Sequence, residues 1–155
     1  MFAGYGIVDG EINAYKDVEV TGKLVMILDG SPSGYKPSVS GLASPANVLS
    51  KIGRAQEHGA VAVLFIYNNY PRKTFNGVSS YSMDGYAESL FPQTFSVSAE
   101  VAEKIMGADG KGLIEKMKTS PLPSKTYTAD IDLSYFKATK TAYASNVMGP
   151  AGRDG

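Results

Sequence analysis

The part of the sequence that organises the fold runs through residues 51–67, KIGRAQEHGAVAVLFIY. Gly59 supplies a left-handed stop for a helix. The apolar run that begins at Ala60 has strand length and no polar alternation, which is typical of a strand covered on both faces. Residues 22–30, GKLVMILDG, show the same strand pattern upstream. The order strand, helix, strand predicts a right-handed parallel crossover, with residues 22–30 as the central strand.

The connecting helix is predicted from a start signal and an amphipathic pattern. Ser44 is a favoured capping residue and Pro45 suits the first helical position, so we expect the helix to extend from there to about His58. Because its two faces differ in polarity, it should pack on one face only. The apolar face carries Val48, Ile52 and Ala55, and the opposite face carries Lys51, Arg54 and Glu57.

Toward the N-terminus, the sequence predicts a short strand and a turn. Residues 2–8 combine aromatic and branched residues with two glycines. They end at Asp9-Gly10, a dipeptide that suits a type I′ turn. We therefore expect a strand over residues 2–8 that leads directly into this turn.

Beyond residue 91, a third strand and a second helix are expected. Residues 92–99, PQTFSVSA, have the composition of a short strand. Ser98 is placed to cap a helix that follows, and Gly107 is placed to end it. The residues expected to face inward from this helix are Val101, Ala102 and Ile105.

Two more elements complete the expected fold. Asp109 is placed to cap a last short helix that runs through Lys118. Residues 126–136, TYTADIDLSYF, alternate between apolar and polar side chains, which predicts a half-exposed strand. Its apolar face would carry Tyr127, Ala129, Ile131, Leu133 and Tyr135. Together these elements predict a mixed α/β fold.

Composition limits the classes of partner. The chain has 155 residues, with 15 Lys plus Arg against 15 Asp plus Glu, and no Cys. A single domain of this length buries enough surface to form one core without disulfides or metals. The balanced charge excludes the basic field that nucleic-acid or anionic-membrane binding requires. We expect no nucleic-acid partner and no membrane partner.

The sequence offers few side chains arranged for catalysis. His58, the single histidine, lies at the end of the predicted helix, where an imidazole interacts favourably with the helix dipole, so we expect a structural role. Ser33 and Lys36 have a Ser-x-x-Lys spacing, as do Ser134 and Lys137. The companion motifs of serine hydrolases with this spacing are missing, so we interpret both pairs as accidental.

A pair of carboxylates is the only hint of a metal site. Asp130 and Asp132 share one face of the predicted strand and would be able to hold a hard cation. Two carboxylates without further oxygen ligands usually form a solvated strand face instead. We expect no metal site, no cofactor site and no catalytic residue in this chain.

The segment from Asn68 to Phe91 is the main candidate for a recognition surface. It has no clear hydrophobic period, and loops of this length are usually functional or mobile. Its aromatic side chains offer the large amphipathic contact area found at recognition surfaces, although rings that fold back over the sheet would explain them equally well. The candidate substrate or partner contacts are Tyr70, Phe75, Tyr81 and Tyr86.

Four segments together resemble the protease-associated (PA) domain, in particular the version inserted in zinc aminopeptidases of the glutamate carboxypeptidase and bacterial leucyl aminopeptidase type. They are FAGYGIVDGEINAYKDVEVTGKLVMILDG (2–30), KIGRAQEHGAVAVLFI (51–66), FPQTFSVSAEVAEKI (91–105) and ASNVMG (144–149). The resemblance implies a small sheet or open barrel with flanking helices, in the swivelling β/β/α architecture of that family. Residues 1–145 would form this domain.

For function, the resemblance implies a noncatalytic accessory domain of a secreted or periplasmic zinc-dependent aminopeptidase. Such a domain covers or borders the active-site cleft and influences access of peptide substrates, or it binds proteins. Residues 146–155 resemble a linker toward a catalytic domain, which would hold the zinc of the parent protein. The expected partners are that peptidase domain in the same chain and a peptide or protein substrate.

Two other functions remain open from the sequence. One is a freestanding protein-interaction domain like those of receptors and sorting proteins. The other is a small hydrolase that uses Ser33 or another loop serine with a lysine base.

Overall fold

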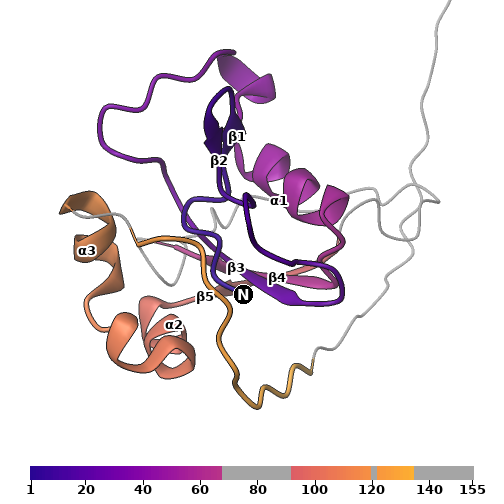
Figure 1. Cartoon of the computed structure of the whole chain (residues 1–155), viewed down its shortest axis with the longest axis vertical. Helices are drawn as coiled ribbons and strands as arrows, with labels where there is room; N and C mark the ends of the chain where they lie inside the picture. The colour runs from indigo at the N-terminus through magenta and orange to yellow at the C-terminus, as the bar shows by residue number, and fades with distance from the viewer. Residues whose placement is uncertain (68–91, 120–121, 135–155) are drawn as a thin grey trace, which may run out of the picture.

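A computed structural model describes residues 1–67, 92–119 and 122–134. The fold is mixed α/β, as predicted, with the elements shown in Figure 1. The strands are β1 (Val8–Asp9), β2 (Ile12–Asn13), β3 (Leu24–Leu28), β4 (Ala62–Ile66) and β5 (Gln93–Val97). The helices are α1 (Val48–Glu57), α2 (Ala99–Met106) and α3 (Leu113–Thr119), with 3₁₀ turns at Gly41–Ala43 and Gly107–Asp109.

The main sheet consists of β3, β4 and β5 in that order, and all its neighbours are parallel. Leu24 pairs with Ala62, which pairs in turn with Gln93. The connection from β3 through α1 to β4 joins parallel strands, which confirms the parallel crossover. The prediction that residues 22–30 form the central strand is wrong, because β4 has that place.

The N-terminal segment covers the outer edge of β3. Phe2 forms a parallel bridge with Met26 on one side and an antiparallel bridge with Lys125 on the other. The amide of Ala3 donates to the carbonyl of Met26 at 2.9 Å, and the amide of Met26 donates to the carbonyl of Met1 at 2.7 Å. Of the predicted strand over residues 2–8, the structure contains only the bridge at Phe2 and Val8, the first residue of β1.

The first hairpin differs from its predicted form. β1 pairs with β2 antiparallel, with Asp9 opposite Ile12, so Gly10 and Glu11 are the two turn residues. Gly10 has a positive φ of 58°. Glu11 does not have a positive φ, because Asp17 is the one non-glycine residue with a positive φ in the described part of the chain. A type I′ turn needs positive φ at both turn residues, so the predicted turn type is wrong.

The main sheet separates two apolar layers, because successive strand side chains point to opposite faces. One layer contains Val25, Ile27, Val63 and Phe65 with Ala55 of α1. The other contains Met26, Leu28, Leu64 and Ile66 with residues of α2 and α3. α1 therefore covers one face, and α2 with α3 covers the other.

The start of α1 lies later than predicted. Asn47 is the capping residue, and its side-chain oxygen accepts a hydrogen bond from the amide of Leu49 at 2.9 Å. Ser44 and Pro45 precede the helix, and Ser44 ends the 3₁₀ turn instead. The end of the helix is as predicted, since Gly59 has a φ of 83° directly after His58.

The second helical region confirms part of its prediction. Ser98 occupies the capping position of α2, and Gly107 ends the helix with a φ of 61°. Ala102 is fully buried, but Val101 is 37% exposed, so its predicted inward position is wrong. Asp109 does not cap α3, which begins at Leu113, because its side chain is bound elsewhere, as described below.

Residues 126–134 are extended but form no strand, which contradicts the prediction for this segment. Ile131 is 37% exposed and Leu133 is 38% exposed, so the apolar side of the alternation is only partly covered. Residues 135 and 136 of the predicted strand lie outside the described residues. Among the helices that the structure describes, none is long and apolar enough to cross a membrane.

Candidate functional site

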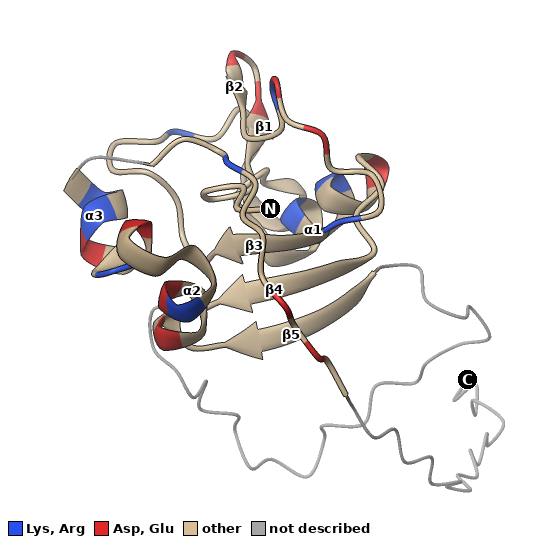
Figure 2. Cartoon of the chain, turned by 60° about the horizontal axis from the view of Figure 1, so that its bottom comes forward, with Lys and Arg blue, Asp and Glu red and all other residues tan. Residues whose placement is uncertain are grey.

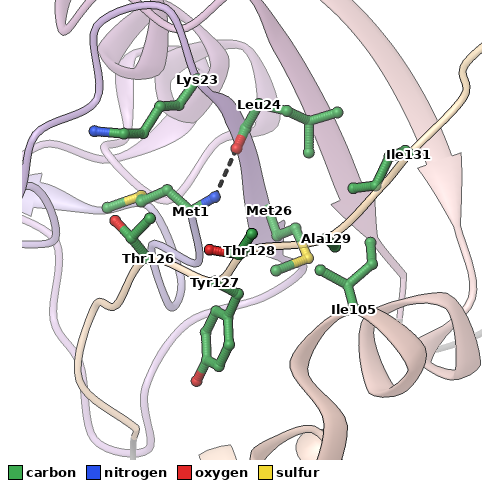
Figure 3. Close-up of a pocket in the computed structure, with 10 residues that line it drawn as sticks. All are labelled: Met1, Lys23, Leu24, Met26, Ile105, Thr126, Tyr127, Thr128, Ala129 and Ile131. Carbon is green, nitrogen blue, oxygen red and sulfur yellow. Dashed lines mark hydrogen bonds between the residues drawn. The ribbon is translucent and has the colours of Figure 1, made fainter.

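A groove with a volume of about 310 Å³ lies between the start of β3, the helix α2 and residues 126–131 (Figure 3). We call residues 126–134 the strap. Most of the groove lining is apolar, with two threonine side chains from the strap and Lys23 at the rim. The lining residues are Met1, Lys23, Leu24, Met26, Ile105, Thr126, Tyr127, Thr128, Ala129 and Ile131.

The floor of the groove is fixed by the backbone of the N-terminal segment. The amino group of Met1 donates to the carbonyl of Leu24 at 2.8 Å (Figure 3). Burial lowers the pKa of this amino group, and the nearby charge of Lys23 lowers it further. The amide of Phe2 donates to the carbonyl of Lys125 at 2.8 Å, and the amide of Lys125 returns the bond at 3.0 Å. The strap therefore starts from a rigid anchor.

Asp109 forms a second anchor for the strap. One of its carboxylate oxygens accepts from Nζ of Lys125 at 2.8 Å and from the hydroxyl of Tyr127 at 2.9 Å. These two hydrogen bonds, the one from Lys125 first, lower the pKa of Asp109. Burial, followed by the hydrogen bond to Asp109, raises the pKa of Tyr127 to about 12. The contact explains why Asp109 does not cap α3.

Beyond this anchor the strap has no backbone partner. Within the described part of the chain, the amides and carbonyls of residues 126–134 form no backbone hydrogen bond. Its two acidic residues, Asp130 and Asp132, are exposed, and they form the red bands on the strap in Figure 2. The strap thus presents backbone groups without a backbone partner among the described residues, beside an apolar groove.

Lys51 is a buried cation that the sequence prediction placed on the solvent side of α1. Its side chain is 0% exposed, and its Nζ donates to the carbonyl of Leu28 at 3.2 Å and to the carbonyl of Gly30. The ammonium also lies 5.8 Å from the ring centre of Tyr5 and 5.7 Å from that of Phe65. Burial lowers the pKa of Lys51 to about 8, while the charge of Asp29 acts in the opposite direction.

The surroundings of Lys51 explain its position. Its whole side chain is buried, and its ammonium binds carbonyls at the carboxyl end of β3. The two rings add an attraction for the positive charge. Lys51 therefore ties α1 to the main sheet, which is a structural role.

The single histidine has the structural position that was predicted. His58 ends α1, and its ring stacks on Tyr15 with centroids 4.6 Å apart and an interplanar angle of 25°. Tyr15 is 3% exposed, and its hydroxyl is the one buried side-chain polar atom without a hydrogen bond in the described residues. Burial raises the pKa of Tyr15. The sequence gives no sign of this unsatisfied hydroxyl.

The other candidates from the sequence are not brought together. Ser33 and Lys36 are both exposed on the loop after β3 and share no hydrogen bond. Ser134 is exposed, and Lys137 lies outside the described residues. In the described ranges, no group of three or more His, Cys, Asp or Glu side chains is placed to hold a metal ion. Asp130 and Asp132 therefore belong to no such group there.

The predicted aromatic contacts lie outside the described residues. They are Tyr70, Phe75, Tyr81 and Tyr86. The predicted linker, residues 146–155, also lies outside them. The groove and the strap are therefore the candidate site that the structure contributes.

Comparison with known proteins does not add a relative. No protein-family model, no curated protein and no solved structure matches this chain.

Proposed function

We propose that this chain is a noncatalytic accessory domain, resembling the PA domain, of a secreted or periplasmic zinc-dependent aminopeptidase. It covers or borders the active-site cleft of a peptidase domain in the same chain and influences the access of peptide substrates. The zinc belongs to that peptidase domain.

One observation carries the proposal: three of the four resembling segments assemble around one sheet. Residues 2–30 supply β3 and the segment that pairs with its outer edge. Residues 51–66 supply most of α1 and the central strand β4, and residues 91–105 supply β5 and most of α2. Segments recognised separately along the chain thus form one connected unit, as expected if they resemble one domain. The fourth segment lies outside the described residues.

The arrangement of this unit also supports a binding role. The groove joins β3 and α2 to the strap and is lined mainly by apolar side chains. Protein sites that bind other molecules are concave and mostly apolar, with a few polar groups that set orientation. Polypeptide segments next to a peptidase cleft would provide such a ligand.

The proposal is tested by aminopeptidase assays with added zinc. Hydrolysis of aminoacyl chromogenic substrates would be compared between this chain, the longest product of its gene, and that product without residues 1–145. We expect no turnover by this chain, turnover by the longest product, and a changed preference for peptide length after the deletion.

Two outcomes would reject the proposal. Turnover by this chain that is lost on Ser33→Ala would identify the small hydrolase instead. Absence of zinc-dependent peptidase activity in the longest product would favour a freestanding interaction domain.

A further inference from the structure

We propose that Asp29-Gly30 is a site of spontaneous backbone modification, at which Asp29 converts to isoaspartate in the folded protein. The amide nitrogen of Gly30 attacks Cγ of Asp29 and forms a cyclic imide. Hydrolysis of the imide then leaves the main chain running through the side-chain carbonyl of residue 29. The inference is independent of the proposed function, because the reaction needs only this chain and water.

The conversion consists of two balanced steps. In the first, the Gly30 nitrogen forms a bond to Cγ of Asp29 and loses its proton, while one oxygen of the side-chain carboxyl group leaves as water. In the second, water adds its hydroxyl to the main-chain carbonyl carbon of Asp29. The bond from that carbon to the Gly30 nitrogen breaks as the electron pair returns to the imide, which takes up a proton. One water leaves and one is added, so no oxidant or cofactor is required.

The first argument is the approach of the two reacting groups. Oδ1 of Asp29 accepts a hydrogen bond from the amide of Gly30 at 2.9 Å. Since Cγ is bonded to that oxygen, the carboxyl group lies folded over the nitrogen that attacks it. Within the described part of the chain, this is the one hydrogen bond of the Asp29 carboxylate. Reactions are accelerated when the reacting atoms are held close together in this way.

The second argument is the fixed backbone around this pair. The amide of Asp29 donates to the carbonyl of Ile66 at 2.8 Å. Nζ of Lys51 donates to the carbonyls of Leu28 and Gly30, one on each side of Asp29. These contacts hold the dipeptide in place at the carboxyl end of β3. Gly30 is nevertheless exposed, so water has access to the imide.

The third argument is the contrast with the two other Asp-Gly pairs that the structure describes. At the first of them, one oxygen of Asp9 accepts from the hydroxyl of Tyr35 at 2.6 Å and from the amide of Ser38 at 2.9 Å. Hydrogen bonds from Ser38 and Tyr35 lower the pKa of Asp9. The carboxyl group is thus held toward the loop after β3 and kept ionised, and a carboxylate is a weaker electrophile than the neutral acid.

Asp109, in the second pair, is restrained at both reacting groups. Its carboxylate binds Lys125 and Tyr127, as described above. The amide of Gly110, which would have to attack it, donates instead to the carbonyl of Gly107 at 3.0 Å. Folding should therefore suppress the reaction at Asp9 and Asp109 and leave it open at Asp29.

The test follows oxygen from water labelled with a heavy isotope, because hydrolysis of the imide adds one solvent oxygen to the residue. The whole chain is incubated at neutral pH, and peptide mapping by mass spectrometry measures the label at each Asp-Gly pair. In the folded chain we expect at least about tenfold more label at Asp29 than at Asp9 or Asp109. In the urea-unfolded chain, which lacks these contacts, the three sites should agree within about threefold.

Three variants provide the controls. Asp29→Glu keeps the charge but lengthens the side chain, so the five-membered imide cannot form and the label at position 29 should disappear. Tyr35→Phe removes one hydrogen bond from Asp9, and Tyr127→Phe removes one from Asp109. Each should raise the label at its own aspartate about threefold and leave that at Asp29 unchanged.

Several results would overturn the proposal. Equal label at the three sites of the folded chain, or less label at Asp29 than at the other two, would reject the selection of this pair. Label that persists at position 29 in Asp29→Glu would reject the imide. Unchanged label at Asp9 and Asp109 in the phenylalanine variants would show that hydrogen bonding of the carboxylate does not control the reaction.

Discussion

β4 and the strap are both extended, yet their surroundings differ completely. β4 is paired along both edges, and its residues Val63 to Ile66 are at most 1% exposed. The strap is paired along neither edge among the described residues, and Leu133 within it is 38% exposed. A sequence pattern can therefore set an extended backbone, whereas a strand forms only where a neighbour supplies its hydrogen bonds.

The largest expected effect comes from removing a ring from β4. Phe65→Ala should lower the free energy of unfolding by about 3–5 kcal/mol, because a fully buried phenylalanine is replaced by a cavity. The matched change in the strap, Leu133→Ala, should cost less than about 1 kcal/mol. Urea unfolding followed by circular dichroism measures both values. Similar losses from the two variants would show that the strap is part of the core.

A second experiment tests how the buried ammonium of Lys51 makes the free energy of unfolding depend on pH. Unfolded Lys51 keeps its proton up to a pKa of 10.5, whereas the folded residue loses it at about 8. Between these values the unfolded state binds more protons, so the free energy of unfolding should rise with pH. The full rise attributable to Lys51 is about 3 kcal/mol.

Lys51→Met isolates this contribution. The variant removes the titrating amine, so its free energy of unfolding should rise less than that of the wild type between about pH 8 and 10.5. Other groups titrate equally in both proteins and cancel in the difference. Parallel pH profiles for the two proteins would contradict the burial of the Lys51 ammonium.

A substitution between α1 and β4 should change the free energy of unfolding by an intermediate amount. Gly59 has a φ of 83°, and a Cβ at this position would lie 3.1 Å from Cα of Thr21. Gly59→Ala should therefore lower the free energy of unfolding by about 2 kcal/mol, through backbone strain and the close approach. Gly34→Ala is the control, because Gly34 has a φ of 75° with open space around it. Gly34→Ala should lower the free energy of unfolding by only about 1 kcal/mol. Thermal unfolding of the two variants measures both values.

The smallest effect is a gain in stability. Tyr15→Phe removes a buried hydroxyl that has no hydrogen bond in the described residues while keeping the ring that stacks on His58. We expect the free energy of unfolding to rise by about 1 kcal/mol. A loss of stability in denaturant titrations would show that this hydroxyl has a partner in solution.

Much of the fold was readable from local patterns. The parallel crossover followed from two apolar runs on either side of an amphipathic helix, and the glycines that end α1 and α2 followed from their positions. The position of Lys51 was also readable, because it falls three residues after Val48 and four before Ala55, on the same helical face. Its charge led to the wrong prediction, since a long side chain can bury its stem and bind carbonyls with its tip.

The errors elsewhere arose from contacts between distant parts of the chain. Asp109 has the position of a capping residue, but its carboxylate binds Lys125 and Tyr127 instead. The alternation in the strap is a local pattern and contains no information about a neighbouring strand. The groove also depends on contacts between distant parts of the chain, because it lies where the N-terminal segment, α2 and the strap meet.

The pairing of Phe2 with Lys125 also has a consequence for synthesis of the protein. The two residues are separated by about 120 positions, and ribosomes add about 5–20 residues per second. Lys125 is therefore synthesised roughly 6–25 seconds after Phe2, whereas Met26, the other partner of Phe2, is synthesised much sooner. During translation, the edge of the nascent sheet at Phe2 stays open until the end of the groove is made.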